Sequence, residues 1–205
     1  EAMKIAVIGG TGMVGSATVT EAASRGHEVV SASRSARHAE GATQDVSLTL
    51  TDTQAVVDLV NSSDATVIAV SAGRGESAQP VINAHRALIA AAPASRLVVV
   101  GGAGSLLTPD GARLVDSPDF PEEYKPEALA FSEILDLYRE AGSALSWTLL
   151  SPAPEFTNRP RTGTYIEGAD EPAGSEISVA DFAVALVDEA EKDSHRGRRW
   201  TIANA

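Results

Sequence analysis

The stretch that decides the fold lies near the start of the chain and reads KIAVIGGTGMVG over residues 4–15. Its apolar beginning, residues 4–8, predicts a short buried strand. Three glycines follow at i, i+3 and i+6, namely Gly9, Gly12 and Gly15. After them the pattern becomes helical, from residue 13 to about residue 25. Strand, glycine-rich turn and helix in this order are the context in which such a triplet indicates a dinucleotide-binding turn.

Each of these glycines has an expected task. Gly9 allows the tight turn, Gly12 lets backbone N–H groups approach a pyrophosphate, and Gly15 lets the helix pack closely on the strand. The helix start adds unpaired N–H donors and partial positive charge for the phosphates. The residues expected to contact the phosphates are Gly9, Thr11, Gly12, Met13, Val14 and Gly15.

Strands and helices alternate along the rest of the chain. Further strands are expected at about residues 28–33, 43–46, 65–70, 97–100, 147–150 and 200–202, with a short one near residues 164–166. Helices are expected at about residues 52–61, 79–92, 127–141 and 181–191. Loops are expected at residues 71–75 and 105–126. This alternation predicts an α/β fold, a Rossmann-type doubly wound, mostly parallel sheet with helices on both faces.

No linker or repeat divides the 205 residues, so we expect a single NAD(P)-binding domain over residues 1–205, with residues 152–177 covering the substrate. A net charge of −12 argues against a nucleic-acid partner. No apolar run approaches the roughly 18 residues that span a bilayer, and no basic and apolar leader precedes the first strand. The chain has no cysteine, which excludes disulfides and thiolate chemistry. We expect a cytoplasmic monomer or homodimer that acts on a small molecule.

The end of the second strand indicates which dinucleotide binds. An acidic side chain there pairs with a ribose 2′-hydroxyl, whereas an arginine suits a 2′-phosphate. The chain offers Ser33, Arg34 and Arg37, with no carboxylate before Glu40. We therefore expect NADP(H) to be preferred over NAD(H), the alternative being a solvated basic loop.

The other strand ends complete the expected cofactor site. Asp45 either accepts a hydrogen bond from the adenine amino group, with Val46 packed on the ring, or caps a turn. Small residues after the fourth strand allow close approach of the backbone to the ribose beside the nicotinamide. The ends of the fifth and sixth strands border the nicotinamide itself. The expected contacts at these later strand ends are Ser71, Ala72, Gly73, Gly101, Gly102 and Pro152.

Several motifs carry a family resemblance. They are the opening glycine turn, LVVVGGAGS (97–105), YKPEAL (124–129), WTLLSP (147–152), RTG (161–163) and ISVADFAVALVDE (177–189). With them the chain resembles, over nearly its whole length, the atypical short-chain dehydrogenase/reductases. Within these it is most similar to the small bacterial NAD(P)-binding proteins described as NADH-flavin reductases, which are close to NmrA-like proteins. The resemblance implies a Rossmann core, NAD(P)H binding and oxidoreductase activity, without a particular substrate.

One departure from that family concerns catalysis. Its typical members carry Tyr-x-x-x-Lys, but here the residues four positions after Tyr124, Tyr138 and Tyr165 are alanine, glycine and alanine. In NmrA-like relatives a lysine precedes a helix glutamate; if that is Glu133, the lysine position holds Leu129. A flavin reductase does not need this dyad, because hydride passes directly between the two cofactor rings.

Ser105, Tyr124 and Lys125 are the candidates for donors near the acceptor, although Tyr124 and Lys125 equally suit a loop anchor before the next helix. The four histidines show no metal spacing and are expected to be structural, as is Asp181. The basic run 195–199 is expected to be a solvated turn. Two functions remain: an NADPH-dependent reductase of a flavin, quinone or similar planar acceptor, with the flavin as substrate, or a non-catalytic NADP(H)-binding redox sensor of the NmrA-like type.

Overall fold

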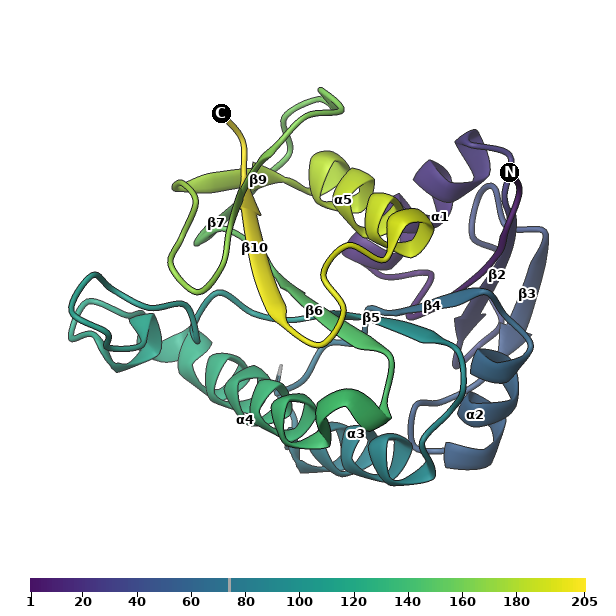
Figure 1. The fold of residues 1–205 in the computed structure, drawn as a ribbon, viewed down its shortest axis with the longest axis horizontal. Coiled ribbons are helices and arrows are strands. Elements are labelled where there is room, and N and C mark those ends of the chain that lie inside the picture. The colour runs from purple at the N-terminus through teal and green to yellow at the C-terminus, as the bar shows by residue number, and fades with distance from the viewer. Residues whose placement is uncertain (74) are drawn as a thin grey trace.

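The computed structural model describes residues 1–73 and 75–205; Arg74, inside the loop predicted at residues 71–75, lies outside the described residues. Strands and helices alternate along the chain (Figure 1). The strands are β1 (Lys4–Ile8), β2 (Glu28–Ser33), β3 (Gln44–Ser47), β4 (Ala65–Ile68), β5 (Arg96–Val100), β6 (Trp147–Ser151), β7 (Glu155–Thr157), β8 (Ile166–Gly168), β9 (Glu176–Ser178) and β10 (Arg199–Ala203). The α-helices are α1 (Met13–Ser24), α2 (Thr53–Asn61), α3 (Gln79–Ala91), α4 (Lys125–Ala141) and α5 (Val179–Lys192).

Eight of these strands form one sheet in the order β3-β2-β1-β4-β5-β6-β10-β8. All neighbours are parallel except β8, which runs antiparallel to β10. The chain steps outward from β1 to β2 and β3 and then returns to the other side of β1 with β4. This reversal leaves a crevice beyond the carboxyl ends of β1 and β4. The predicted Rossmann-type α/β fold is confirmed.

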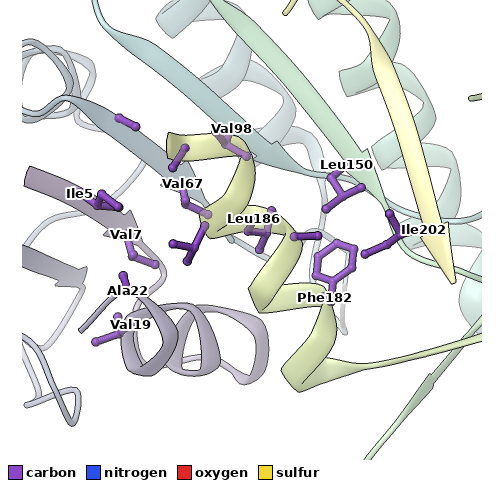
Figure 2. Packing of buried hydrophobic residues seen from close by; sticks show 14 of the residues in the cluster. Ile5, Val7, Val19, Ala22, Val67, Val98, Leu150, Phe182, Leu186 and Ile202 are labelled. Carbon is purple, nitrogen blue, oxygen red and sulfur yellow. The ribbon is translucent and has the colours of Figure 1, made fainter. Parts of the chain in front are cut away.

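Helices cover both faces of the sheet (Figure 1), with α1 and α5 on one face and α2, α3 and α4 on the other. The residues buried between the sheet and helices α1 and α5 form the first core. Figure 2 shows it, with Phe182 and Leu186 of α5 pointing toward the sheet beside Leu150 and Ile202. Because the central strands are buried on both faces, they consist of apolar runs rather than alternating residues. The helices therefore hold the strand ends, and the crevice between them, in fixed positions.

The residues buried between the sheet and helices α2, α3 and α4 form the second core, which contains a buried polar pair. His85 of α3 and Tyr138 of α4 are joined by a hydrogen bond of 2.7 Å between Nδ1 and the phenol oxygen, and their rings meet edge to face. Burial lowers the pKa of His85 to about 4, because the apolar surroundings disfavour the charged imidazolium. The histidine is structural, as predicted.

Three of the boundaries that differ from the predicted ones have clear local reasons. The strand expected to reach residue 70 ends at Ile68, because its partner β1 leaves the sheet at Gly9. Helix α4 begins at Lys125, earlier than expected, because Pro126 is tolerated in a first helical turn. Helix α5 begins at Val179, where the Ser178 side chain caps it by accepting from the backbone N–H of Asp181.

The end of the chain differs most from the prediction. Strands β7 and β9 form a separate parallel pair that the sequence pattern did not indicate, and the short strand lies at residues 166–168. The basic run is a solvated turn only in part: residues 196–198 are exposed, but His195 and Arg199 at its two ends are buried. The His195 ring stacks on Trp200 at 3.8 Å and lies between the carboxylates of Glu189 and Glu167. Hydrogen-bonded partners of this kind make the burial of a polar side chain possible.

Candidate cofactor-binding site

The turn between β1 and α1 depends on close backbone approaches that only glycine allows. Gly9 has a φ of +87°, and a Cβ there would lie 2.3 Å from the carbonyl oxygen of Ala69. A Cβ on Gly15 would lie 1.9 Å from the carbonyl oxygen of Gly9, so the start of α1 rests directly on the turn. These two glycines have the steric roles expected from their spacing.

Gly12 lies in more open surroundings. A Cβ there would meet the Gly9 carbonyl oxygen at 3.4 Å, an ordinary contact distance. Gly12 is the extended N-cap of α1; among the described residues no side chain hydrogen-bonds to this helix end, and its first turn has no acidic residue. In this described part of the chain, the first backbone N–H groups of α1, at the positive end of the helix dipole, are therefore left without a capping side chain. Met13 beside them is 54% exposed, whereas Val14 packs on the core.

Gly10 has a steric role that the three-residue spacing did not reveal. A Cβ there would lie 2.1 Å from the hydroxyl oxygen of Ser31 on β2. The second glycine of the turn thus lets β1 and β2 end side by side. The doubled glycine at positions 9 and 10 is the signal in the sequence that could have indicated this approach.

A groove of about 560 Å³ opens beside the turn, at the end of β2, lined by Thr11, Ser33, Arg34, Ser35 and Arg37. The Arg37 guanidinium donates to the Thr11 carbonyl oxygen at 3.3 Å, which links the loop after β2 to the glycine turn. The buried Ser33 hydroxyl has no hydrogen-bond partner in the part of the chain that the structure describes. No carboxylate lines the groove, and its two guanidiniums suit an anionic group.

Asp45 holds the loop after β2. Its carboxylate accepts from the Ala39 backbone N–H at 2.9 Å and meets the His38 Nδ1 at 2.7 Å. These contacts, that of His38 first, lower the pKa of Asp45. Both carboxylate oxygens are engaged in this loop, which corresponds to the turn-capping alternative for Asp45. Val46 beside it is half-buried and packs on the second core.

The end of β4 meets the start of α4. Ala72 is buried and Ser71 is exposed. Gly73 has a φ of +79°, and a Cβ there would lie 3.3 Å from the backbone nitrogen of Glu127. The small residues after β4 therefore bring the crevice beyond β1 and the first turn of α4 together.

The ends of β5 and β6 are packed just as closely. A Cβ on Gly101 would lie 2.3 Å from the Leu149 side chain, and one on Gly102 would lie 3.3 Å from Phe131 of α4. Pro152 is buried directly after β6. Ser105 is 8% exposed, and its hydroxyl accepts a hydrogen bond of 2.8 Å from Arg199. Arg199 was missed by the sequence reasoning, because nothing in the basic run marks which arginine turns inward.

Tyr124 and Lys125 lie at the start of α4. They directly precede Pro126 and Glu127, whose backbone approaches Gly73. Tyr124 is 60% exposed and ends a short 3-10 turn over Glu122–Tyr124. The Lys125 ammonium pairs with the Glu122 carboxylate at 2.7 Å, so its charge is engaged locally. Ala128, at the position of the lysine in Tyr-x-x-x-Lys, packs on Gly104.

The remaining tyrosines lie away from the crevice. Tyr138 is enclosed in the second core, and Tyr165 donates to the Asp188 carboxylate at 2.7 Å on the α5 side. Burial raises the pKa of both phenols, with a further contribution at Tyr165 from Asp188. A catalytic tyrosine needs a lowered pKa, so neither phenol has the surroundings of one.

The predicted covering segment, residues 152–177, is fastened at its middle to α1 and α5. The Arg161 guanidinium pairs with the buried Glu21 carboxylate of α1 at 2.7 Å. The buried Asp181 carboxylate accepts from the backbone N–H groups of Thr162 and Gly163, each at 2.9 Å. Burial opposes ionisation of Asp181, but these hydrogen bonds lower its pKa. Asp181 is therefore an anchor for the RTG motif and not a group facing the crevice.

Two absences hold for the residues described. No group of three or more His, Asp or Glu side chains gathers as a metal site would require. No helix is long and apolar enough to cross a bilayer.

Comparison with known proteins assigns the family that this fold and site define. The model of the NAD(P)H-binding family matches residues 9–193, which include the glycine turn and the ends of β2, β4, β5 and β6. The chain belongs to this family. The predicted resemblance and the NAD(P)H-binding Rossmann class are thereby confirmed.

Individual relatives span the whole chain. An uncharacterized protein of Bacillus subtilis strain 168, YwnB, is 39% identical over 214 residues, covering 98% of this chain and 99% of YwnB. A crystal structure of a "putative NADH-flavin reductase" from Streptococcus pneumoniae TIGR4 is 36% identical, with a TM-score of 0.85 and 100% of each chain covered. A "putative exported protein" from Burkholderia pseudomallei is 34% identical, with a TM-score of 0.86 over 98% of this chain and 99% of that chain.

Proposed function

We propose that the protein is an NADPH-dependent reductase that transfers hydride directly to a flavin, a quinone or a similar planar acceptor. The observation that carries the proposal is the groove beside the glycine turn, which Arg34 and Arg37 line together with Thr11, with no carboxylate among the lining residues. The NADPH diphosphate would lie on the start of α1, and the 2′-phosphate in this groove. The likeness to the streptococcal protein described as a putative NADH-flavin reductase supports the choice of acceptor.

The chain's own residues have a limited part in such a reaction. The bound nicotinamide supplies the hydride, and the protein aligns the two rings and excludes water. The expected nicotinamide contacts, Gly101, Gly102 and Pro152, stand at the ends of β5 and β6. Donors for the acceptor's oxygens come from Ser105, Tyr124 or Lys125. The exposed Tyr124 also offers an aromatic surface just before the start of α4.

Cofactor preference is tested by titrating the protein with NADPH and NADH and following the cofactor fluorescence. We expect tighter binding of NADPH, and we expect Arg34→Ala to weaken NADPH binding by roughly ten- to a hundred-fold while NADH binding stays unchanged. Arg198→Gln serves as the matched control, because this exposed arginine lies away from the groove. Tighter binding of NADH, or an Arg34→Ala variant with full NADPH affinity, contradicts the proposed selectivity.

Acceptor reduction is tested by the oxidation of NADPH in the presence of FMN, riboflavin or a benzoquinone. We expect turnover with at least one of them. A protein that binds NADPH and reduces none of them contradicts the reductase proposal. We propose that the reaction takes place in the cytoplasm. The protein acts as a monomer or homodimer and binds no nucleic acid.

A non-catalytic NADP(H) sensor of the NmrA-like type is the alternative. The missing dyad favours it, since Ala128 and Leu129 stand where a lysine would act. A sensor must distinguish NADP⁺ from NADPH and change its contacts with a protein. Equal affinity for the two oxidation states removes this alternative.

A further inference from the structure

The side chain of Arg199, the first residue of β10, is only 1% exposed, yet it joins three separate parts of the chain. Its guanidinium donates to the Ser105 hydroxyl at 2.8 Å and to the Ser105 carbonyl oxygen at 3.2 Å. It also donates to the Ser151 hydroxyl at 3.2 Å and to the Asp170 carboxylate at 2.9 Å. The arginine thus connects the ends of β5 and β6 with the segment before β9.

The anionic partner of this arginine stands at the surface. Asp170 is 46% exposed at its side chain and is shared with Arg139 of α4, which pairs with it at 2.8 Å. A guanidinium loses hydration when it is buried, and a half-exposed, shared carboxylate compensates this only in part. The inner contacts of Arg199 are instead with Ser105, in the loop after β5, and with Ser151, the last residue of β6. These two strand ends are the ones expected to border the nicotinamide.

The chemistry of these contacts fixes the direction of the Ser105 hydroxyl. A guanidinium only donates hydrogen bonds, so the Ser105 oxygen must accept, and its own proton remains free to be donated. The positive charge beside the oxygen strengthens the hydroxyl as a donor. Ser105 also lines a cavity of about 140 Å³, whose other polar lining residues are Arg113, Ser132, Asp136, Arg139, Asp170 and Arg199 itself. Among the described residues the Ser105 hydroxyl donates to no protein group, so this proton is available to an oxygen atom of a bound molecule.

We infer that Arg199 is a positioning residue: it holds the loop after β5 in place and directs the Ser105 hydroxyl toward a carbonyl oxygen of the acceptor. The inference rests on the proposed reductase function and deepens it. It also narrows the acceptor to molecules that carry a hydrogen-bond-accepting carbonyl beside the ring that takes the hydride. Arg199 itself does not touch the acceptor, and it acts through Ser105.

The test compares Arg199→Gln, Ser105→Ala and the double variant, with Arg198→Gln as the exposed control in the same segment. The measurements are the NADPH dissociation constant, kcat and KM for the acceptor, and binding of oxidised FMN to the protein loaded with NADP⁺. We expect Arg199→Gln and Ser105→Ala each to lower kcat/KM for the acceptor by about ten-fold, the effect of one lost hydrogen bond in the transition state. We expect NADPH affinity to stay within about two-fold, and the double variant to be no worse than either single one.

Arg199→Lys and Asp170→Asn keep the test valid if Arg199→Gln does not fold. Lysine keeps the charge but contacts fewer groups, so we expect it to recover part of the loss. Asp170→Asn weakens the outer anchor and should lower kcat/KM by less than Arg199→Gln does.

Full kcat/KM in Arg199→Gln, equal losses of NADPH affinity and turnover, or additive losses in the double variant would overturn the inference alone. A wild-type protein that binds NADPH but neither binds nor reduces any acceptor would overturn the proposed function and this inference together.

Discussion

The turn between β1 and α1 and the region around the end of β5 lie at the same edge of the sheet, but different contacts hold them in place. At the turn, backbone meets backbone: a Cβ on Gly9 or Gly15 would lie 2.3 or 1.9 Å from a carbonyl oxygen. Around β5, side chains from distant parts of the sequence meet, as Arg199 does with Ser105 and Asp170. Contacts of the first kind can be predicted from glycines at a fixed spacing in the sequence. Contacts of the second kind form between distant segments and can be seen only in the folded chain.

The largest expected effect tests the backbone side of this comparison. Gly15→Ala places a methyl group against the fixed Gly9 carbonyl, so we expect a loss of about 3 kcal/mol or more in the free energy of unfolding. Gly12→Ala meets nothing closer than 3.4 Å and should change stability by less than about 1 kcal/mol, while weakening NADPH binding. Urea unfolding and cofactor titration measure the two effects. Equal losses of unfolding free energy in both variants would show that the steric difference between Gly12 and Gly15 does not affect stability.

The second effect concerns the second core, in which α3 and α4 pack on β5. The folded-state pKa of His85, about 4, lies below its ordinary value of 6.5, so the unfolded chain takes up a proton first as the pH falls. The His85 contribution is fully present above pH 6.5 and is lost as the pH falls toward 4, by about 3 kcal/mol in total. Urea unfolding at several pH values measures this slope. In His85→Gln the part of the pH dependence of unfolding free energy that is due to His85 should disappear. An unchanged slope in this variant would show that other groups cause the pH dependence.

A smaller effect is expected where the covering segment is anchored. Asp181→Asn replaces an acceptor of several hydrogen bonds by an amide with one acceptor oxygen, while Thr162 and Gly163 still present their N–H groups. We expect a loss of about 1 to 2 kcal/mol in unfolding free energy and faster proteolysis near residues 158–165. Because Asp181 faces away from the crevice, NADPH affinity should be unchanged. A loss of cofactor affinity in proportion to stability would place this anchor nearer the site.

The smallest effect distinguishes the two interpretations of Asp45. Both of its carboxylate oxygens are engaged within the loop, by Ala39 and His38. We therefore expect Asp45→Asn to change NADPH affinity by less than about two-fold, well below the effect of a lost contact with the adenine. Fluorescence titration measures it, with Arg34→Ala as the positive control. A ten-fold loss in Asp45→Asn would instead support the adenine contact.

The sequence predicted local features well where one residue type meets one steric need. The bounds of β1 and β2 agree with the expected ones, and the glycine spacing gave the geometry of the turn. It failed where a contact joins distant segments. Strands β7 and β9 are three residues each and pair only with one another, so no periodicity distinguishes them from loop. Likewise, Arg198 and Arg199 are adjacent, but only Arg199 lies on the inward face of a strand.

Residue types and their spacing were enough to predict the α/β class, the position of the glycine turn and the absence of the Tyr-x-x-x-Lys pair. The folded chain was needed to show that Asp45 and Asp181 hold loops, that Tyr138 is enclosed in the core, and that the buried Arg199 contacts Ser105. The physical reason is that a side chain's role depends on which partners surround it and how far it is removed from water. Both are set by packing between segments that lie as far apart as residues 105 and 199.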